Sequence, residues 1–531
     1  MIGRLVLSDR NIYKINNGNK NITARKCLIL SEFHNDILIK SSKDFNQKDE
    51  YVKINPESNT IIDGLGYVGN SQSDIDIYYY LHTLDWMSKS KYNKLWDQID
   101  TSFDLAKSRT DYNNKVITID PLGSIDLDDG FSFSFDDKYY YLDIHIADPI
   151  SLINPDNSNW IDILKELFTR LQTCYVGINP THLLPEKIVQ QITLQSLDNL
   201  NNSNNQIKSR RAITFCFKIG IDITDKLDLD FNLKFTNLTN IKNYTYENYD
   251  QEINFPSNLE TKINLVNMSN KLISLMKANL ENILLDTDIS HKMIEVFMIF
   301  TNWYGGNYLV NNNWTKTIIR VQDPKIFGND CGNDCCNDCG NDCCNDFDIN
   351  QVPLYARPIL SYAANYSYSL SHESNIHYTL GINNYAHISS PMRRVIDMIN
   401  HLGLYQLELK NIIPDFDNYF NLDKINLKLK NYKKISNAYG LVSYIKNSSD
   451  DKKNIFKACL FDWVKLDNSN QIKCMLVLYN EQNNFTKVVN VELPQIELTL
   501  NLKKYIEFDI ELFYNSNKFK SNKFPFSVKL L

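Results

Sequence analysis

The chain has 531 residues and a formal net charge of −7, with 43% hydrophobic and 22% charged residues. This is the composition of a globular protein long enough for several domains. The acidic balance excludes recognition of nucleic acid by a basic field over the whole surface, so such a partner would need a local groove. No apolar run approaches the length of a membrane span, and the first residues lack the apolar core of a signal peptide. We therefore expect a cytoplasmic protein with no membrane partner.

The first part of the chain predicts a small β-barrel. Strand-like runs at residues 4–7, 26–30, 36–39 and 51–54 alternate with polar stretches, and the two glycines of residues 64–67 predict a turn. We assign residues 1–85 to an N-terminal barrel of the OB or cold-shock type. Residues 86–107 predict a helical connector.

Four aspartates lie within ten positions of the central region: Asp120, Asp126, Asp128 and Asp129. The β-branched run 116–119 predicts a buried strand before them, and the alternating run 131–135 predicts a half-buried strand after them. A short loop with four like charges either spreads them into water as a solvated turn or binds a cation, because repulsion would otherwise raise their pKa values. Carboxylate oxygens suit Mg²⁺, and two such ions can hold the attacking and leaving oxygens of a phosphodiester.

Strands and helices alternate beyond the acidic loop. We predict strands at 139–147, 212–221 and 233–235, and helices at 160–175, from 186, at 259–284 and at 292–310. From residue 354 the pattern predicts a helix again.

Residues 328–346 form a repeat of Gly, Asn, Asp and Cys that holds six of the eleven cysteines. Cysteine and aspartate can bind metals, but the repeat has no histidine and no apolar frame, so a disordered tandem expansion is the other interpretation. The remaining cysteines are scattered and are expected to be reduced. They are Cys27, Cys174, Cys216, Cys459 and Cys474.

A second polar cluster follows Ser390. Ser390 before Pro391 predicts the start of a helix that runs to about residue 407 and holds Arg393 and Arg394 in its first turn. Backbone N–H groups and two guanidinium groups would form a phosphate site there. The alternative is a pair of surface arginines.

The C-terminal part predicts a helix and a second barrel. Residues 411–447 are rich in lysine and predicted to be helical, and five strand-like runs follow them. We assign residues 448–531 to an OB-like barrel, a fold that often binds single strands with aromatic and basic side chains. Phe519 and the lysines around it would suit such a contact, although a solvated hairpin end explains them equally well.

In this order, the motifs resemble the catalytic domain of the ribonuclease II/ribonuclease R superfamily, which includes the exosome nuclease subunit. The resemblance covers about residues 108–407. The matching blocks are Arg109-Thr110-Asp111, Thr118-Ile119-Asp120-Pro121, Ile125-Asp126-Leu127-Asp128-Asp129, His145 to Asp148, Arg170 with Tyr175, Leu183-Leu184-Pro185-Glu186, Ile294 to Ile299 with Asn302, and His377 to Asp397 with His401.

The resemblance implies an α+β fold. A central RNB catalytic domain at residues 108–410, a mixed β-sheet with surrounding helices, would be flanked by small OB-type barrels. It also implies a magnesium-dependent, processive 3′→5′ exoribonuclease of RNA degradation or processing, with Mn²⁺ as a substitute metal. Such an enzyme hydrolyses single-stranded RNA to nucleoside 5′-monophosphates by a two-metal mechanism. A monomer that works with partners of an RNA-decay complex is expected.

The resemblance also implies roles for single residues. Asp120, Asp126, Asp128 and Asp129 would hold the metal ions, and Asp128 and Arg393 would be the catalytic pair, with Arg393 stabilising charge on the scissile phosphate. The implied RNA contacts are Tyr175 against a base, Glu295 at the terminal ribose, and His145, Ser390 and Arg394.

The chain departs from the family pattern at several positions. Gly130 stands for an alanine, Thr193 lies in a block that usually has Cys-Ser-Leu, and Val296 takes a position that is often acidic. None of these changes removes an implied metal ligand. The stretch between Arg320 and His377 is short for the family and holds the cysteine repeat, which puts the unwinding of duplex RNA in question. A catalytically silent RNA-binding scaffold on the same fold is the alternative function, and a magnesium-dependent nuclease acting on DNA is a third.

Overall fold

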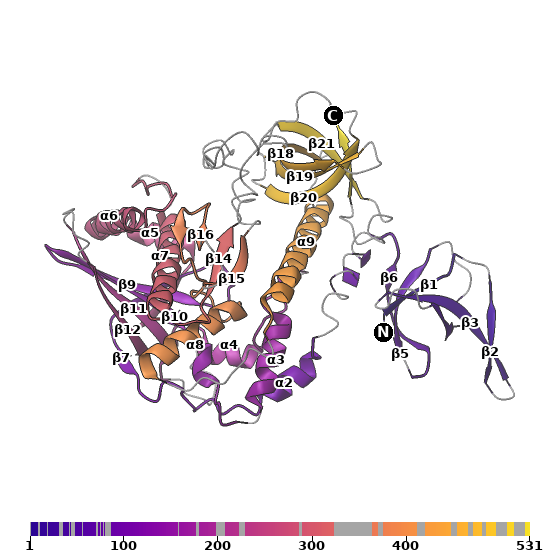
Figure 1. The fold of residues 1–531 in the computed structure, drawn as a ribbon, viewed down its shortest axis with the longest axis horizontal. Coiled ribbons are helices and arrows are strands. Elements are labelled where there is room, and N and C mark those ends of the chain that lie inside the picture. The colour runs from indigo at the N-terminus through magenta and orange to yellow at the C-terminus, as the bar shows by residue number, and fades with distance from the viewer. Residues whose placement is uncertain are drawn as a thin grey trace, which may run out of the picture.

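A computed structural model shows a central part of helices and a sheet, with one small barrel on either side of it in the sequence (Figure 1). The structure describes residues 2–8, 11–17, 20–30, 36–41, 43, 48–55, 57–70, 73–74, 76–77, 79, 86–157, 159–176, 180–197, 208–221, 229–285, 289–322, 364–369, 375–410, 420–447, 454–465, 471–480, 485–494, 507–514 and 526–531. The repeat at 328–346 and the predicted contact at Phe519 lie outside these residues. None of the helices in the described ranges is long and apolar enough to cross a membrane.

The N-terminal strands close into a barrel. They are β1 (Ile2–Leu5), β2 (Tyr13–Asn17), β3 (Lys20–Ile29), β4 (Asp36–Lys40), β5 (Glu50–Asn55) and β6 (Thr60–Tyr67). The order is β1-β5-β6-β4-β3-β2, and β1 also pairs with β3, which closes the ring and leaves β2 at its edge. The turn predicted at residues 64–67 was wrong: these residues end β6, where irregular pairing with β5 and a positive φ at Gly66 accommodate the glycines.

The central sheet has seven strands. They are β7 (Thr110–Tyr112), β8 (Val116–Ile119), β9 (Asp129–Phe135), β10 (Tyr139–Ala147), β11 (Arg210–Gly220), β12 (Leu229–Leu238) and β13 (Ile241–Tyr244), in the order β13-β8-β9-β10-β11-β12-β7. Neighbours are antiparallel except for the parallel pairs β12–β7 and β13–β8. This is the mixed sheet of the predicted α+β fold.

Helices pack on this sheet through aromatic side chains. The helices are α2 (Lys89–Trp96), α3 (Trp160–Arg170), α4 (Glu186–Ile192), α5 (Tyr246–Ile253), α6 (Leu259–Met276), α7 (Ile289–Asn311), α8 (Val395–Leu409) and α9 (Leu422–Asn447), with short 3₁₀ turns at 149–152 and 256–258. The ring centroid of Phe297 in α7 lies 5.3 Å from that of Phe131 in β9. The ring centroid of Tyr405 in α8 lies 4.5 Å from that of Phe235 in β12. Such edge and tilted ring contacts add to the burial that holds helix to sheet.

The C-terminal strands form the second barrel. They are β18 (Ile455–Lys465), β19 (Gln471–Asn480), β20 (Phe485–Pro494), β21 (Glu507–Tyr514) and β22 (Phe526–Leu530), in the order β20-β19-β18-β21-β22. Helix α9 leads from the central part to this barrel and buries Leu441 and Val442 in the barrel's core (Figure 1). The predicted α+β architecture, a mixed sheet with helices flanked by β-rich parts, is thus confirmed, whereas the boundaries at residues 85, 107, 410 and 447 stay predictions.

Several predicted helices end or begin elsewhere. Helix α3 stops at Arg170 rather than near residue 175, because Leu171 takes a positive φ of 69°. Helix α6 stops at Met276 in the same way, with Lys277 in the left-handed region. Where a helix was predicted from residue 354, the described residues form strand β15 (Ala364–Tyr368), paired with β14 (Ile318–Gln322). Strands β16 (Ile376–His377) and β17 (Ile382–Asn383) form a further short pair. Pairing with a distant strand has overridden the local pattern at β15.

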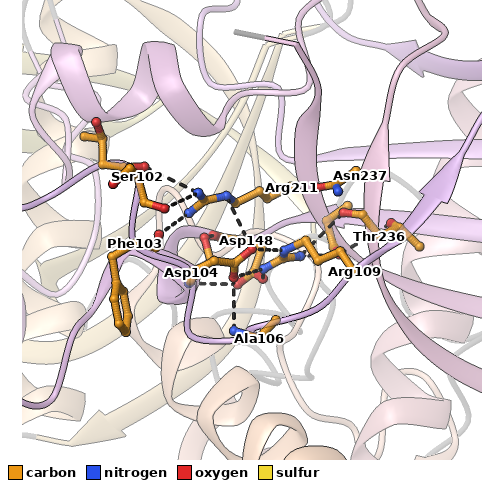
Figure 2. Close-up of polar contacts among 12 residues, drawn as sticks. Ser102, Phe103, Asp104, Ala106, Arg109, Asp148, Arg211, Thr236 and Asn237 are labelled. Carbon is orange, nitrogen blue, oxygen red and sulfur yellow. Dashed lines mark hydrogen bonds and ion pairs between the residues drawn. The ribbon is translucent and has the colours of Figure 1, made fainter.

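A buried ion-pair network surrounds Arg109 beside the central sheet (Figure 2), and Tyr405 connects it to α8. Arg109 donates to Asp148 at 2.6 Å and to Asp104 at 2.6 Å, and Tyr405 of α8 donates to the same Asp148 oxygen at 2.6 Å. Arg211 forms a longer ion pair with Asp104 at 3.6 Å. Because Asp148 and Arg109 are both buried, each depends on the other for neutralisation.

We expect Asp148→Ala to lower the free energy of unfolding by about 3–5 kcal/mol, because it leaves the Arg109 guanidinium buried without its main partner. Tyr405→Phe keeps the ion pair and should cost only about 1–2 kcal/mol. Urea unfolding followed by circular dichroism measures both. Tyr141→Phe, which removes a hydroxyl bonded to Asp136 at the surface, is the matched control and should stay within about 0.5 kcal/mol of the unaltered protein. Equal effects of Asp148→Ala and Tyr141→Phe would contradict the network's role.

Candidate active site

The acidic loop connects the end of β8 to the start of β9, its antiparallel neighbour in the sheet. Asp120 follows β8 directly and its N–H donates to Tyr244 O of β13 at 3.1 Å. Ser124 N–H then donates to Pro121 O at 3.1 Å, and Gly123 between them has a φ of +86°, as the third residue of a type II turn requires. Asp129 is the first residue of β9. The strands therefore fix both ends of the loop, as the sequence predicted.

Asp128 is the point at which two distant segments meet. Its carboxylate is 2% exposed, and one oxygen accepts the N–H of Met392 at 2.8 Å while the other accepts Nε of Arg393 at 3.2 Å. Arg393 lies 265 residues from Asp128 in the sequence. Arg393 also donates from Nη2 to Ser390 Oγ at 2.9 Å, and its side chain remains 43% exposed. One face of this guanidinium is thus held by Asp128 while another part of it reaches solvent.

The segment from Ser390 to Arg394 is a turn rather than the start of a helix. Helix α8 begins at Val395, and Arg394 before it is extended and forms a bridge with Gln172. The predicted location of Arg393 and Arg394 in a first helical turn was therefore wrong. The segment is fixed instead by its backbone, since Thr173 N–H donates to Arg393 O at 2.9 Å.

Ser390 and Arg394 are occupied by contacts within the chain. Ser390 N–H and Arg394 Nη2 both donate to the same oxygen of buried Asp397, at 2.7 and 2.8 Å. Ser390 itself is buried, and its hydroxyl accepts from Arg393. The structure thus gives both residues a part in holding Arg393, and their prediction as direct RNA contacts remains untested.

The acids of the loop influence one another. Burial, followed by the charge of Asp129, raises the pKa of Asp120 to about 7. Burial likewise raises the pKa of Asp129 to about 6 and that of Asp128 well above its ordinary value, in both cases against the opposing effect of Arg393. The nearby arginines, Arg393 and for Asp129 also Arg394, do not offset the effect of burial on these carboxylates.

The residues of this loop fit a divalent cation. Within the described part of the chain, the Oδ2 atom of Asp120 is buried without a hydrogen-bond partner. The carboxylates also repel one another, so a bound cation would both give this oxygen a partner and reduce the repulsion. The described residues contain no preformed group of three or more His, Cys, Asp or Glu side chains that could hold a metal ion. Asp120, Asp126, Asp128 and Asp129 therefore stay predicted ligands, brought to one loop and electrostatically coupled.

Other side chains border the acids. Tyr175 is 55% exposed, and its hydroxyl lies 3.5 Å from Asp126 Oδ2, which is also 3.9 Å from His182 Nδ1. Glu295 is exposed on α7, one turn after His291. The ring of His291 stacks on Tyr246 with centroids 3.7 Å apart.

Sequence analysis missed Tyr246 and His182. The charges of Asp129 and Asp120 both act on Tyr246, whose pKa is raised chiefly by burial, so it lies close to the acidic loop. Tyr246 opens α5, and no local pattern connects that helix with the loop. His182 directly precedes the matching block Leu183 to Glu186 but was not part of it, and it carried no spacing signal of its own.

His145 lies inside the sheet. It is fully buried, with Ser132 Oγ at 3.1 Å from Nε2 and Thr214 Oγ1 at 2.9 Å from Nδ1, and it packs against Tyr112. Burial lowers its pKa to about 3. Its predicted role as an RNA contact does not fit this position, because alternation along β10 turns its ring into the packed face of the sheet.

The family of the chain follows from its central part. Residues 109–410 match the model of the RNB domain, and the chain belongs to this family. The resemblance to the ribonuclease II/ribonuclease R superfamily is thereby confirmed. The family is one of 3′→5′ exoribonucleases that generally use a divalent metal, and some of its members are inactive. No curated protein matches the sequence.

Solved structures share the fold at low identity. The chain is similar to RNase R from Mycoplasma genitalium in complex with ribose-methylated single-stranded RNA, at 13% identity and a TM-score of 0.60 over 100% of this chain and 89% of that one. An active-site mutant of the Dss1 exoribonuclease from Candida glabrata is 18% identical, with a TM-score of 0.55 over 80% of this chain and 56% of that one. Yeast Ssd1, a pseudonuclease, is 13% identical, with a TM-score of 0.53 over 93% and 66%. The chain thus spans little more than half of the Dss1 protein.

The depressed pKa of His145 predicts a pH-dependent stability. The unfolded chain takes up a proton near the ordinary pKa of 6.5, whereas the folded state does so only at about 3, so stability is lost as the pH falls through this window. Between about pH 7.5 and about pH 5 we expect the unaltered protein to lose about 2 kcal/mol more than His145→Gln. Urea unfolding at both pH values measures this difference.

The comparison with a variant is needed because the raised pKa values of Asp120 and Asp129 act in the opposite direction. Their folded forms bind protons that the unfolded chain releases, which adds stability as the pH falls. His291→Gln, at an exposed position, is the control and should retain the full pH dependence. An identical pH dependence in His145→Gln and the unaltered protein would rule out a neutral, buried His145.

Proposed function

We propose that the protein is a magnesium-dependent, processive 3′→5′ exoribonuclease that hydrolyses single-stranded RNA to nucleoside 5′-monophosphates. The observation that carries the proposal is the contact of Arg393 and Met392 with Asp128. It brings a partly exposed guanidinium to a loop of electrostatically coupled carboxylates. A cation-binding acid group beside an arginine is the arrangement that phosphodiester hydrolysis needs.

In this proposal the chain supplies distinct groups to the reaction. Asp120, Asp126, Asp128 and Asp129 would hold magnesium, which when bound neutralises charge and favours ionisation of the attacking water. Arg393 would use the N–H groups that do not contact Asp128 to stabilise negative charge on the scissile phosphate.

The neighbouring side chains would select and place the RNA end. Tyr175 offers an exposed aromatic face on which a base can stack. Its hydroxyl lies 3.5 Å from Asp126 Oδ2, so a stacked base would lie beside the acidic loop. Glu295 would accept hydrogen bonds from the terminal ribose, and the 2′-hydroxyl is the group that distinguishes RNA from DNA. Single-stranded RNA is therefore the proposed partner, and a place among RNA-decay proteins in the cytoplasm is proposed with it.

A catalytically silent RNA-binding scaffold is the second candidate. The similarity to the pseudonuclease Ssd1 favours it, since the same fold supports a protein without activity. A nuclease acting on DNA is a third, and a substrate comparison separates it from the first.

Hydrolysis of RNA by this protein should depend on Asp128. With 5′-labelled single-stranded RNA and Mg²⁺, we expect shortening from the 3′ end with release of mononucleotides, and a fall of at least about 100-fold in Asp128→Asn. EDTA should abolish the reaction, and Mn²⁺ should restore it. The control is Asp111→Asn, which changes an exposed aspartate of the edge strand β7 and should keep full activity.

Each alternative predicts a different result in the same assay. Tight RNA binding without products in any sample would leave the scaffold function, and equal digestion of a DNA strand would favour the third candidate.

Arg393→Lys should separate charge from geometry. Lysine keeps the positive charge but cannot contact Asp128, Ser390 and a phosphate at once, so we expect kcat to fall by about 10²–10³. RNA affinity, measured by fluorescence anisotropy without metal, should change by no more than about threefold because the charge is kept. A variant with unchanged kcat would show that Arg393 only balances the charge of Asp128.

A further inference from the structure

The buried hydroxyl of Thr193, a residue outside the acidic loop, forms hydrogen bonds with the backbone of the loop. Thr193 follows α4, is 1% exposed, and lies against residues 125–127. Its Oγ1 accepts the N–H of Leu127 at 3.0 Å and donates to the carbonyl of Ile125 at 3.0 Å. The next residue, Leu194, donates its N–H to Leu127 O, also at 3.0 Å. Three hydrogen bonds from two consecutive residues thus bracket Asp126.

The rest of the loop offers little other support on this side. Leu122 is 90% exposed, Ile125 is 46% exposed, and a Cβ built at Gly123 would meet no atom within 4 Å. Among the residues that the structure describes, Asp126 has long contacts with Tyr175 and His182. Leu127 itself packs in the hydrophobic core. Between the turn at Gly123 and Leu127, the backbone is held by the hydrogen bonds to Thr193 and Leu194 rather than by side-chain packing.

The residue that holds the loop is itself fixed. Thr193 N–H caps α4 by donating to Val189 O at 2.8 Å. Arg210 of β11, which is fully buried, donates to Gln190 O at 2.6 Å and to Gln195 O at 3.1 Å on either side of Thr193. The hydroxyl is thus anchored to the central sheet, and the loop takes its position from that anchor.

We propose that Thr193 is a positioning residue that sets the backbone of Asp126, and through Leu127 that of Asp128, for cation binding. It acts through two main-chain groups and touches neither substrate nor metal. The inference rests on the proposed function of the carboxylates as a cation site. A valine has the same shape as threonine, so the packing around Thr193 does not need the hydroxyl, whereas the loop does.

The test compares Thr193→Val with Thr193→Ser, which keeps the hydroxyl. In metal-free protein, Thr193→Val should speed hydrogen–deuterium exchange of the Leu127 amide, measured by mass spectrometry on peptides that cover residues 120–130. In Mn²⁺ titrations followed by electron paramagnetic resonance, Thr193→Val should weaken binding by about 10-fold to 100-fold, and Thr193→Ser should bind like the unaltered protein. The RNA affinity of metal-free Thr193→Val should not change, because the substrate contacts are intact.

Thr317→Val is the matched control for the loss of a buried hydroxyl. Thr317 is fully buried and its Oγ1 donates to Trp314 O at 2.7 Å, away from the acidic loop. The Thr317→Val variant should be less stable than the unaltered protein but should bind Mn²⁺ with the same affinity. If Thr193→Val and Thr317→Val weaken Mn²⁺ binding equally, or if Thr193→Val exchanges and binds like the unaltered protein, the positioning role is overturned.

The proposed function has its own readout in this experiment. Unaltered protein that binds Mn²⁺ but leaves RNA intact would overturn the exoribonuclease function and keep the inference, provided that the two Thr193 variants differ as stated. Unaltered protein that degrades RNA while both Thr193 variants bind Mn²⁺ normally would overturn the inference alone.

Discussion

The buried carboxylate of Asp128 is the interaction on which the site depends. Its two oxygens accept from Met392 and Arg393, and its own carbonyl accepts the N–H of Ala147 at 2.8 Å. The turn that contains Met392 and Arg393 also binds the segment that carries Tyr175, since Thr173 N–H donates to Arg393 O. One residue therefore joins the acidic loop, the central strand β10, the turn before α8 and the aromatic segment. A polar group buried this deeply has to be satisfied, and satisfying it brings the four segments together.

Two buried ionic groups of the chain differ in their charge balance. At Asp148, a carboxylate meets an arginine and a tyrosine hydroxyl at 2.6 Å each, and every partner is enclosed. At the acidic loop, burial raises the pKa values of Asp120, Asp128 and Asp129, and repulsion between carboxylates adds to the effect at Asp120 and Asp128. Arg393 opposes the effect at all three, and Asp120 keeps a buried oxygen without a hydrogen-bond partner among the described residues. The first group is complete and stabilises the junction of sheet and helix. The acidic loop has too little positive charge to balance its carboxylates, which is typical of a site that binds a cation.

The sequence predicted what depends on short-range pattern and order. The strands on either side of the acids, the two barrels and α7 follow from alternation, β-branched runs and helical periodicity, and the motif order identified the family. It could not predict the start of α8, because contacts with residues 171–173 hold Arg394 in an extended conformation. The burial of His145 depends on partners in β9 and β11, and the role of Thr193 depends on a loop 66 residues away in sequence. Such pairings are set by tertiary structure and leave no local signal.

The placement of the acids also bears on the choice between enzyme and scaffold. RNA is recognised through its phosphates, and several carboxylates beside Arg393 repel phosphate unless cations stand between them. A protein that only binds RNA would hold its ligand more tightly with neutral residues at Asp120, Asp128 and Asp129, and it would avoid the desolvation that raises their pKa values. The cost is understandable if a cation neutralises the loop and the phosphate then meets both the cation and Arg393. The buried carboxylates of this loop, whose ionised form needs a cation, therefore favour catalysis over binding alone.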